Sequence, residues 1–370
     1  MHNCEAVSSH LKNPEASGQV YKPLVSIVVP GYNEAENLGK NLARLCEYME
    51  SLEDTYRWEL IFVNDGSTDE TGEVAEMFAK TRSNVRVLHH IKNFRLGQAL
   101  RYAFNNCNGE YIVTMDSDLS YSPDHIERLL NKLRETRAKI VIASPYMKGG
   151  HVSNVPWKRR KLSIWANRFL SLTAQGGNLS TFTGMVRAYD GKFLKTLNLK
   201  AMGMEINAEV IYKAMLLRAL IVEIPAHLDW GFQKSRDTRR RSSMKILKTI
   251  VSYLLSGFFF RPFMFFVIPG FLLMLISVYP FSWVFIHTVV NYRNLSSSFN
   301  AFDLRLSAAV AAAFQQSPHS FIIGSITLVL GIQLSSLGIL ALQSKHYFEE
   351  LFSLGTTLYR YNRENNDIQS

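Results

Sequence analysis

Three short acidic segments hold the residues whose types and spacing could do chemistry. They are Val29–Glu34 (Val-Pro-Gly-Tyr-Asn-Glu), Asn64–Asp69 (Asn-Asp-Gly-Ser-Thr-Asp) and Met115–Leu119 (Met-Asp-Ser-Asp-Leu). In the last segment, Asp116 and Asp118 flank one residue, and side chains at i and i+2 of an extended segment share a face. Paired carboxylates with an open coordination sphere favour Mg²⁺ or Mn²⁺. A cation held in this way can bridge a diphosphate and stabilise the charge that develops as a glycosidic bond breaks.

The other two segments carry groups that suit a nucleotide. Asp65 can accept hydrogen bonds from a base or ribose, Pro30 and Tyr32 can shape a base pocket, and Glu34 can also reach the nucleotide. Taken singly, each segment has an ordinary explanation, because Asp-Gly-Ser is usually a turn and a lone Asp-x-Asp is usually a solvated loop. Their order along the chain, each at the end of a predicted strand, favours a binding site.

Alternating strands and helices must position these segments. Short β-branched runs predict strands, and apolar residues at helical spacing predict helices, at Leu24–Val29, Ala35–Met49, Leu60–Val63, Val85–Leu88, Gly97–Asn105, Tyr111–Thr114, Asp124–Leu133 and Ile140–Ala143. Thr68 is expected to cap a helix with Asp69 and Glu70 in its first turn. Strands separated by single helices imply an α/β fold with a parallel sheet between helices. Ligands of such sheets bind beyond the carboxyl ends of the strands.

These motifs make the chain resemble the family 2 glycosyltransferases of the GT-A fold, whose sheet is mostly parallel, from about Leu24 to Trp230. Within that family it is most similar to the polyprenyl-phosphate sugar synthases of the dolichyl-phosphate mannose synthase type. Besides the three acidic segments, the matching stretches are Asn93–Ala99, Ser122-Pro123, Trp157, Arg160, Ser163, Thr183-Gly184, Glu205 and Val222–Pro225.

The resemblance implies roles for particular residues. Asp65 would contact the nucleotide of a UDP- or GDP-linked sugar, and Asp116 and Asp118 would bind the metal diphosphate. Arg160 and Ser163, in a loop that contacts the acceptor, would lie near the acceptor phosphate. Two membrane helices after the catalytic domain also occur in that subgroup.

The chain departs from the subgroup's pattern at several positions. Asn64 stands where the subgroup commonly has Asp, and Ser120 stands where it has Gln. Pro145 replaces an arginine expected to help hold the acceptor phosphate, and the usual Arg-x-x-Gly-x-Ser-Lys motif is not cleanly present. These departures affect the acceptor more than the enzyme class. The Gln-x-x-Arg-Trp motif of processive polysaccharide synthases is absent, which argues against a polymerase.

Two classes of acceptor are compatible with the sequence. A hydroxyl acceptor needs a general base, for which Glu205 is the best candidate, although a structural carboxylate is its more ordinary interpretation. A phosphomonoester, with a second pKa of about 6, is already largely anionic and needs only positioning. The cationic stretch Trp157–Lys161 offers no carboxylate, which favours phosphate, but a basic helix start facing anionic lipid fits it equally well. The predicted catalytic residues are Asp118, Arg160 and Glu205.

We therefore expect non-processive, inverting sugar transfer to a lipid-linked acceptor, with polyprenyl phosphate as the leading candidate. The alternatives are transfer to a membrane lipid hydroxyl and a catalytically silent nucleotide-binding membrane partner. The three intact aspartates argue against the silent partner.

Two C-terminal segments are apolar enough to span a membrane. Phe263–Val290 carries no Lys, Arg, Asp or Glu and exceeds the roughly 20 residues that a bilayer requires. Ser320–Leu342 is the second predicted span, and its small residues would permit close helix packing. A buried helical hairpin in a soluble domain is the alternative. The stretch before the first span is basic, whereas the loop between the spans holds only Arg293 and Arg305, so both termini are expected in the cytoplasm.

The predicted organisation has five parts. A polar tail covers residues 1–22, a GT-A catalytic domain 23–233, and a basic amphipathic interfacial helix 234–262; a two-helix transmembrane region covers 263–343 with an outward loop at 291–319, and a cytoplasmic tail covers 344–370. The net charge is +10, and basic residues cluster just before the first span. This cluster favours anionic lipids over nucleic acid as a partner. The three cysteines show no ligand spacing and fit reduced thiols. The sugar and the oligomeric state, a homo-oligomer included, are left open.

Overall fold

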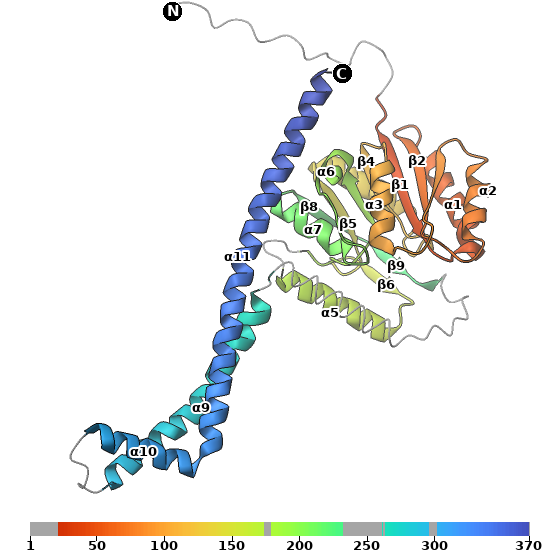
Figure 1. Ribbon diagram of the computed structural model, residues 1–370. Coiled ribbons are helices and arrows are strands. Elements are labelled where there is room, and N and C mark those ends of the chain that lie inside the picture. The colour runs from red at the N-terminus through yellow and green to blue at the C-terminus, as the bar shows by residue number, and fades with distance from the viewer. Residues whose placement is uncertain (1–20, 174–178, 232–260, 262, 296–301, 370) are drawn as a thin grey trace, which may run out of the picture.

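The structure is a computed structural model that describes residues 21–173, 179–231, 261, 263–295 and 302–369 (Figure 1). The predicted N-terminal tail, apart from residues 21 and 22, lies outside the described residues. The predicted amphipathic helix at 234–262 also lies outside them, apart from residue 261.

A seven-stranded sheet forms the centre of the N-terminal domain, in the order β3-β2-β1-β4-β7-β5-β8. Its strands are β1 (Leu24–Gly31), β2 (Arg57–Asn64), β3 (Val85–His89), β4 (Tyr111–Thr114), β5 (Ile140–Ser144), β7 (Arg187–Asp190) and β8 (Ile221–Pro225). Strand β7 is antiparallel to β4 and β5, and the other pairings are parallel. A separate parallel pair joins β6 (His151–Ser153) to β9 (His227–Asp229). The expectation of a mostly parallel sheet is confirmed.

Helices cover both faces of the sheet (Figure 1). They are α1 (Ala35–Glu50), α2 (Thr71–Ala79) and α4 (Asp124–Thr136) on one face, and α3 (Leu96–Asn106), α6 (Gly191–Thr196) and α7 (Ile206–Leu216) on the other. Successive side chains of a strand point to opposite faces. Ile27 and Val29 therefore pack in the core on the side of α1, α2 and α4, whereas Val28 packs in the core on the side of α3, α6 and α7. All of these side chains are fully buried. The alternation of strands and helices thus builds two cores around one sheet.

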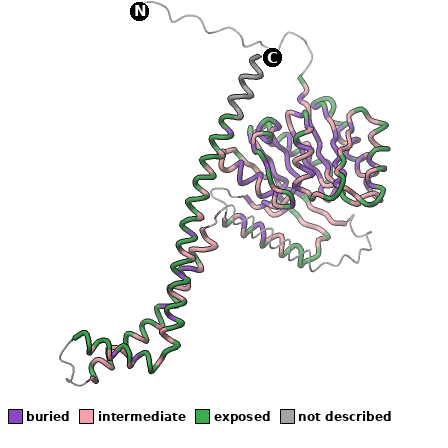
Figure 2. Tube along the Cα trace, viewed as in Figure 1, coloured by how far each residue is buried: buried purple, intermediate pink, exposed green. Residues whose placement is uncertain are grey.

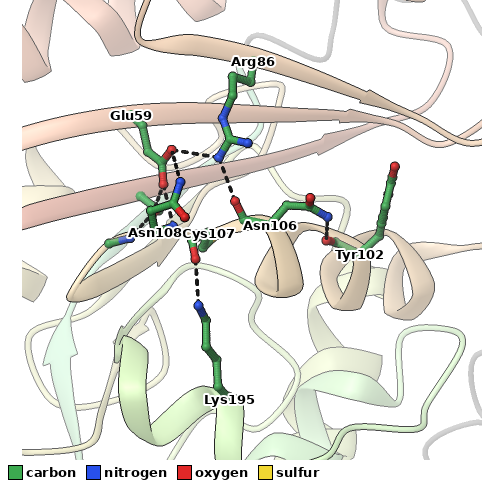
Figure 3. A network of polar contacts seen from close by, with 9 residues as sticks. Glu59, Arg86, Tyr102, Asn106, Cys107, Asn108 and Lys195 are labelled. Carbon is green, nitrogen blue, oxygen red and sulfur yellow. Dashed lines mark hydrogen bonds and ion pairs between the residues drawn. The ribbon is translucent and has the colours of Figure 1, made fainter. Parts of the chain in front are cut away.

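A polar network ties the amino-terminal edge of the sheet together (Figure 3). Glu59 on β2 accepts from the Arg86 Nη2 at 2.8 Å and from the Asn108 backbone N–H at 2.8 Å. The same Arg86 nitrogen donates to the Asn106 carbonyl at 2.7 Å, and Lys195 Nζ donates to the Cys107 carbonyl at 2.8 Å. Burial would raise the pKa of Glu59, but hydrogen bonds from Ser26, Asn108 and Arg86 together with the arginine charge lower it overall. The network fixes the turn from α3 into β4, so the opposite edge is left for ligands.

The C-terminal region is helical; its first part extends away from the domain, and the later part of its last helix runs beside the domain (Figure 1). It contains α9 (Met264–Asn294), α10 (Phe302–Gln316) and α11 (Pro318–Gln369). Two of these, α9 and α11, are long and apolar enough to cross a membrane. Only 11% of the apolar stretch of each helix is buried. Figure 2 shows the corresponding exposure along both helices. The first predicted span is therefore matched by α9, which contains Pro269 and Pro280.

Helix α11 differs from the predicted second span in its length. The span was expected to end at Leu342, but the helix continues to Gln369, so the predicted cytoplasmic tail is largely helical. The predicted outward loop likewise contains helix α10. Helices α9 and α11 pack closely, because a Cβ at Gly270 would lie 2.8 Å from the Gly331 carbonyl oxygen. Small residues at this crossing permit the approach, as the sequence indicated.

Candidate active site

The loops after β1 and β2 are joined by hydrogen bonds at the carboxyl edge of the sheet. Asn33 has a positive φ of 56°. Its backbone N–H donates to Ser67 Oγ at 3.0 Å, and its Oδ1 accepts from the Thr68 N–H at 2.9 Å. The Glu34 N–H donates to Thr71 Oγ1 at 2.7 Å. Two of the three acidic segments therefore form one rigid rim.

The expectation that Thr68 caps a helix is wrong. Helix α2 begins at Thr71, three residues further along the chain. The Thr68 N–H is used by Asn33, whereas Asp69 Oδ1 accepts from the Thr71 N–H at 3.0 Å. The side chain of Asp69 therefore satisfies a backbone donor at the helix start, which is the role that the sequence assigned to Thr68.

The residues predicted to contact the nucleotide occupy this rim at different depths. Pro30 and Glu34 are half-buried, and Tyr32 is 38% exposed. Asp65 is only 4% exposed. The exposed tyrosine ring and the buried carboxylate suit different tasks, because a ring can stack on a base while a buried carboxylate holds fixed donors.

Asp65 is the centre of a network that the sequence analysis did not predict. Its Oδ1 accepts from the Phe94 N–H at 3.0 Å and contacts His90 Nδ1 at 2.7 Å. The Asp65 N–H donates to the Gly31 carbonyl at 3.0 Å, and the His90 ring stacks on Tyr102 with centroids 5.2 Å apart. His90 follows strand β3 directly, so the rule that informative residues come just after strands could have identified it.

Gly66 lies where the backbone of another loop approaches the motif. Its φ is +65°, and a Cβ at this position would lie 2.1 Å from the carbonyl carbon of Lys92. An L-residue in this conformation is strained by about 1–3 kcal/mol, and a contact with backbone cannot be relieved by side-chain rotation. The glycine therefore allows the β2 loop and the Lys92 segment to pack together beside Asp65.

We expect Gly66→Ala to lower the thermal unfolding temperature by several degrees and to weaken nucleotide binding. The matched control is Gly39→Ala in α1, where the nearest atom to the new Cβ is Val74 Cγ1 at 3.7 Å and helix propensity favours alanine. Differential scanning fluorimetry of both variants checks this expectation. Equal unfolding temperatures would contradict the steric argument.

Asp116 and Asp118 are brought together at the end of β4. Ser120 contacts both: its Oγ donates to Asp116 Oδ2 at 3.2 Å, and its N–H donates to Asp118 Oδ1 at 3.0 Å. Burial, followed by the charge of Asp118, raises the pKa of Asp116 to about 7. Ser120, which stands where the subgroup has glutamine, thus orients both carboxylates.

The backbone between the two aspartates is a turn and not the extended segment that the sequence suggested. The Leu119 N–H donates to the Asp116 carbonyl at 3.2 Å, and Leu119 has a φ of 50°. The Met115 N–H still donates to the Val28 carbonyl of β1 at 2.9 Å, and beyond it the polar stretch closes a hydrogen bond within itself. The expected proximity of the two carboxylates is nevertheless present through Ser120.

The donor set at this position fits a hard divalent cation. Among the residues that the structure describes, no group of three or more His, Cys, Asp or Glu side chains could hold a metal ion by itself. Two adjacent carboxylates, one buried and strained by the charge of the other, would be stabilised by a cation between them. Such a pair leaves coordination positions for phosphate oxygens and water.

Tyr121 and Tyr146 connect the aspartate pair with helix α5 (Trp157–Thr173). Burial raises the pKa of Tyr121, and the charges of Asp116 and Tyr146 act in the same direction. Burial also raises the pKa of Tyr146, while its hydrogen bond with Ser163 and the charge of Arg160 oppose the shift. Electrostatic interactions therefore link Asp116 to Tyr121, Tyr121 to Tyr146, and Tyr146 to Arg160 and Ser163 of α5.

Arg160 and Ser163 lie on a helix and not in the loop that the sequence suggested. Asn167, which is 2% exposed, attaches α5 to the domain because its Oδ1 accepts from the Phe182 N–H at 2.7 Å and the Thr183 N–H at 3.2 Å. Residues three and four positions apart share a helix face, so Arg160 and Ser163 point to the same side as Asn167.

A cavity of about 890 Å³ opens between α5 and the end of β5. Its lining residues include Pro145, Tyr146, His151, Ser153, Arg160, Ile164, Arg168, Leu172, Leu179 and Ser180. It combines two arginines with apolar side chains, a mixture suited to an anionic head group that bears a hydrocarbon tail. Pro145, which replaces the arginine of the subgroup's pattern, lies in this lining beside the two arginines of α5.

Glu205 lies at the start of α7, where its Oε1 accepts from the Gly203 N–H at 2.8 Å. A negative charge at a helix amino terminus is stabilising in its own right. This contact is the kind that a structural carboxylate makes, and it supports the more ordinary interpretation of Glu205.

Arg187 on β7 is a buried cation that the sequence analysis missed. Its Nη1 donates to the Asn207 carbonyl and its Nη2 to the Phe182 carbonyl, both at 2.8 Å. Burial lowers its pKa. The side chain joins the segment bearing Thr183 to the first turn of α7, and a lone arginine in a four-residue strand offers no sequence signal for that role.

Comparison with known proteins identifies the family of this chain. The chain matches the model of glycosyl transferase family 2 over residues 26–197. It is 31% identical over 207 residues to an undecaprenyl-phosphate mannosyltransferase from Micrococcus luteus, with 54% of this chain and 82% of that protein covered. The chain belongs to glycosyltransferase family 2. Its α/β domain is accordingly GT-A-like, followed by two long apolar helices that could span a membrane.

Further relatives of this family 2 chain have similar names. It is 30% identical over 228 residues to a polyprenol monophosphomannose synthase from Mycolicibacterium smegmatis, covering 59% of this chain and 83% of that protein. A mannosyltransferase from Pyrobaculum calidifontis, solved with GDP-Man and Mn²⁺, has 14% identity and a TM-score of 0.43 over 91% of this chain and 87% of that one.

Proposed function

We propose that this chain is a metal-dependent, inverting and non-processive hexosyltransferase that uses polyprenyl phosphate as its acceptor. The observation that carries the proposal is the connection from the Asp116–Asp118 pair, through the buried Tyr121 and the half-buried Tyr146, to the arginine-lined cavity at α5. This arrangement supports a donor site at the carboxylates and a neighbouring acceptor site of opposite charge at α5. The names of the relatives from Micrococcus luteus and Mycolicibacterium smegmatis, which specify polyprenyl-type acceptors, support the same substrate class.

On the donor side, the loop residues would hold a UDP- or GDP-linked sugar. Tyr32 would lie against the base, with Pro30 and Glu34 beside it, and Asp65 would position the rim through its backbone partners. Asp116 and Asp118 would hold Mg²⁺ or Mn²⁺, which stabilises the negative charge of the departing nucleoside diphosphate.

On the acceptor side, Arg160 and Ser163 would hold the phosphate head group. A phosphomonoester oxygen is largely deprotonated near neutral pH, so its attack on the anomeric carbon requires orientation and no base. Attack from the face opposite the leaving diphosphate would invert the anomeric configuration. The hydrogen bond of Glu205 with the Gly203 N–H is compatible with this proposal, because it leaves the glutamate in a structural role.

The exposed side of α5 supports a position at the membrane surface. Trp157 is 63% exposed, Trp165 45% and Leu172 73%, and α5 contains no acidic residue. The Phe169 ring contacts the Phe265 ring at the start of α9, with centroids 6.0 Å apart. Tryptophans and cations on one helix suit the interface of an anionic membrane. We propose that a polyprenyl tail reaches the cavity from the bilayer beside α5.

We further propose that the catalytic domain, taken as residues 23–233, and both termini are cytoplasmic. Lys345 of α11 lies over the Tyr212 ring of α7, 6.0 Å from its centroid. The end of α11 and the catalytic domain would therefore share one side of the membrane, and the scarcity of positive charge between the spans favours the cytoplasm for that side.

The enzymatic proposal is tested by incubating membranes that contain the protein with a panel of radiolabelled UDP- and GDP-sugars and polyprenyl phosphate. We expect one donor to give a labelled lipid that mild acid releases, as it does a glycosyl phosphate. An acid-stable product would favour a hydroxyl acceptor, and the absence of any lipid product with every donor would contradict the proposal.

The orientation is tested with two engineered cysteines in a Cys4→Ser background, since Cys46 and Cys107 are buried. Asp303→Cys in α10 is expected to react with a membrane-impermeant maleimide added outside intact cells. Ser353→Cys in α11 is expected to react only after permeabilisation. The reverse pattern would show that the protein is inserted in the opposite orientation.

A further inference from the structure

One face of α11 packs against its own chain along most of the helix. Gly331 and Gly338 contact α9, and Lys345 and Phe352 continue the same line at intervals of seven residues. Lys213 of α7 lies over the Phe352 ring, 5.5 Å from its centroid. Thr356, next on this face, is 5% exposed. The inner face therefore passes from α9 to the catalytic domain without a break.

The other face of the same segment carries large apolar side chains that stay more than half exposed in the described chain. Leu351, at the edge of this face, also lines a cavity between α11 and the catalytic domain. Tyr347 is 55% exposed, Leu351 68%, Leu354 60% and Leu358 55%. Their spacing of four, three and four residues is the heptad pattern of a two-stranded coiled coil. The positions between them on the outer surface are polar, namely His346, Glu350, Ser353 and Thr357.

This apolar stripe, Tyr347–Leu358, lies beyond the bilayer. A Cβ at Gly338 would meet Val267 near the start of α9, so the apolar hairpin ends close to this level. At 1.5 Å per residue, Leu351 and Leu358 lie about 20 Å and 30 Å further along the helix. Lys345 forms an ion pair with Glu349 at 3.4 Å, and the catalytic domain flanks this part of α11 (Figure 1). Lipid chains therefore do not cover the stripe.

We propose that a second copy of this chain covers the stripe, and that two α11 helices form a parallel coiled coil outside the membrane. Copies inserted in one bilayer have the same orientation, so their α11 helices run parallel. The same stripe on both copies can then meet across a two-fold axis normal to the membrane, which is a closed, self-complementary contact. Antiparallel pairing is excluded by the shared orientation.

The geometry of α11 leaves room for both catalytic domains in such a pair. Phe352 faces its own domain, and the four stripe residues lie about 100° to 160° away from it around the helix. Each domain would therefore lie on the outer side of the pair. The inference uses no residue of the candidate active site and does not depend on the proposed reaction, but it rests on the insertion of α9 and α11 in a membrane.

The contact is tested by cross-linking the full-length protein in a Cys4→Ser background, reconstituted at a high lipid-to-protein ratio. Leu354→Cys is expected to give a dimer with a short bis-maleimide. Ser353→Cys, its immediate neighbour, is the matched control and is expected to remain monomeric, because it points about 100° away. Equal cross-linking of the two variants would indicate random collision and would overturn the proposal.

The mass of the reconstituted particle provides the second measurement. Wild type and Ser353→Glu are expected to contain two copies, whereas Leu354→Glu is expected to lower the apparent association constant about tenfold or more, because a buried apolar contact is lost. Leu354 is solvent-exposed in a single copy, so an unchanged circular dichroism spectrum is expected. A single copy for wild type, three or more copies, or no effect of Leu354→Glu would overturn the proposal.

Discussion

Replacement of Asp118 by alanine is expected to lower the rate of sugar transfer on the order of a thousandfold or more while the protein remains folded. The reason is electrostatic: several kcal/mol of stabilisation for the leaving diphosphate depend on a cation held by the two carboxylates. Asp116→Ala is expected to have a similar effect. Both variants should be assayed with saturating donor and acceptor, so that the change reports on the chemical step.

Two controls separate loss of the metal site from loss of the fold. Asp118→Asn keeps an oxygen that can accept from the Ser120 N–H but removes the charge, so it should be nearly as inactive as alanine. Asp124→Ala removes an exposed carboxylate from α4 whose ion pair with Arg128 spans 3.6 Å, and it should retain activity. An active Asp118→Asn would mean that the hydrogen bond matters and the charge does not.

Stability should change in the opposite direction from activity at Asp116. Burial and the charge of Asp118 both disfavour the ionised form of Asp116, so Asp116→Asn should unfold at the same temperature as wild type or higher. Residues kept for function often reduce stability in this way. Removal of divalent cations by excess EDTA should abolish turnover of the wild-type enzyme, and full turnover under those conditions would contradict the assignment.

The grouping of the three acidic segments at one edge of the sheet could be predicted because it depends on local sequence. The three acidic segments follow strands whose apolar runs are continuous, and parallel pairing aligns the ends of those strands, as Gly31 aligns with Asn64 and Asn64 with His89. Any chain with this order of elements places those loops at one edge of the sheet. Asp116 and Asp118 could therefore be grouped without knowing the turn that connects them.

Strand β7 illustrates what local sequence leaves undetermined. Arg187–Asp190 has four residues and no apolar alternation, and it is held by antiparallel pairing with β4, more than 70 positions earlier in the chain. Arg187 makes its contacts with the Asn207 and Phe182 carbonyls, which only the assembled fold brings within reach. Pairing over such distances overrides short-range propensity.

Helix α5 shows the same limit on the acceptor side. Its start, Trp157–Lys161, has no N-cap residue and no periodic apolar stripe, so a loop was as reasonable as a helix. Asn167 is what secures it, through the Phe182 and Thr183 N–H groups. A polar residue in a helix carries no signal of a distant backbone partner, and the helical geometry of Arg160 and Ser163 could be found only from the fold.

Replacement of Arg160 by alanine is expected to raise the KM for polyprenyl phosphate about tenfold to a hundredfold, with little change in the KM for the nucleotide sugar. A charge-assisted hydrogen bond to a partly desolvated phosphate contributes about 1.5–3 kcal/mol, which corresponds to this range of affinity. Arg160 lines the cavity beside Pro145. Because proline cannot supply the charge of the arginine it replaces, Arg160 should carry a larger share of the phosphate contact here than in enzymes with both.

The matched control is Lys158→Ala, two residues away on the same helix. Lys158 Nζ lies over the Trp157 ring, 5.6 Å from its centroid, and Lys158 is absent from the cavity lining. The Lys158→Ala substitution removes one positive charge from α5, as Arg160→Ala does. Any general attraction of the acceptor to a basic surface would therefore weaken equally in both variants. A specific contact predicts a large effect for Arg160→Ala and a small one for Lys158→Ala.

Arg160→Lys extends the comparison, because lysine keeps the charge but not the planar pair of donors that matches phosphate. Partial recovery of the KM would indicate that charge dominates, and full loss would indicate a bidentate contact. The KM for a neutral polyprenol should be the same for the wild-type enzyme and Arg160→Ala. If polyprenyl phosphate also showed no difference between these two enzymes, the arginine-lined cavity would not be the site of the acceptor phosphate, and a hydroxyl acceptor would become the better explanation.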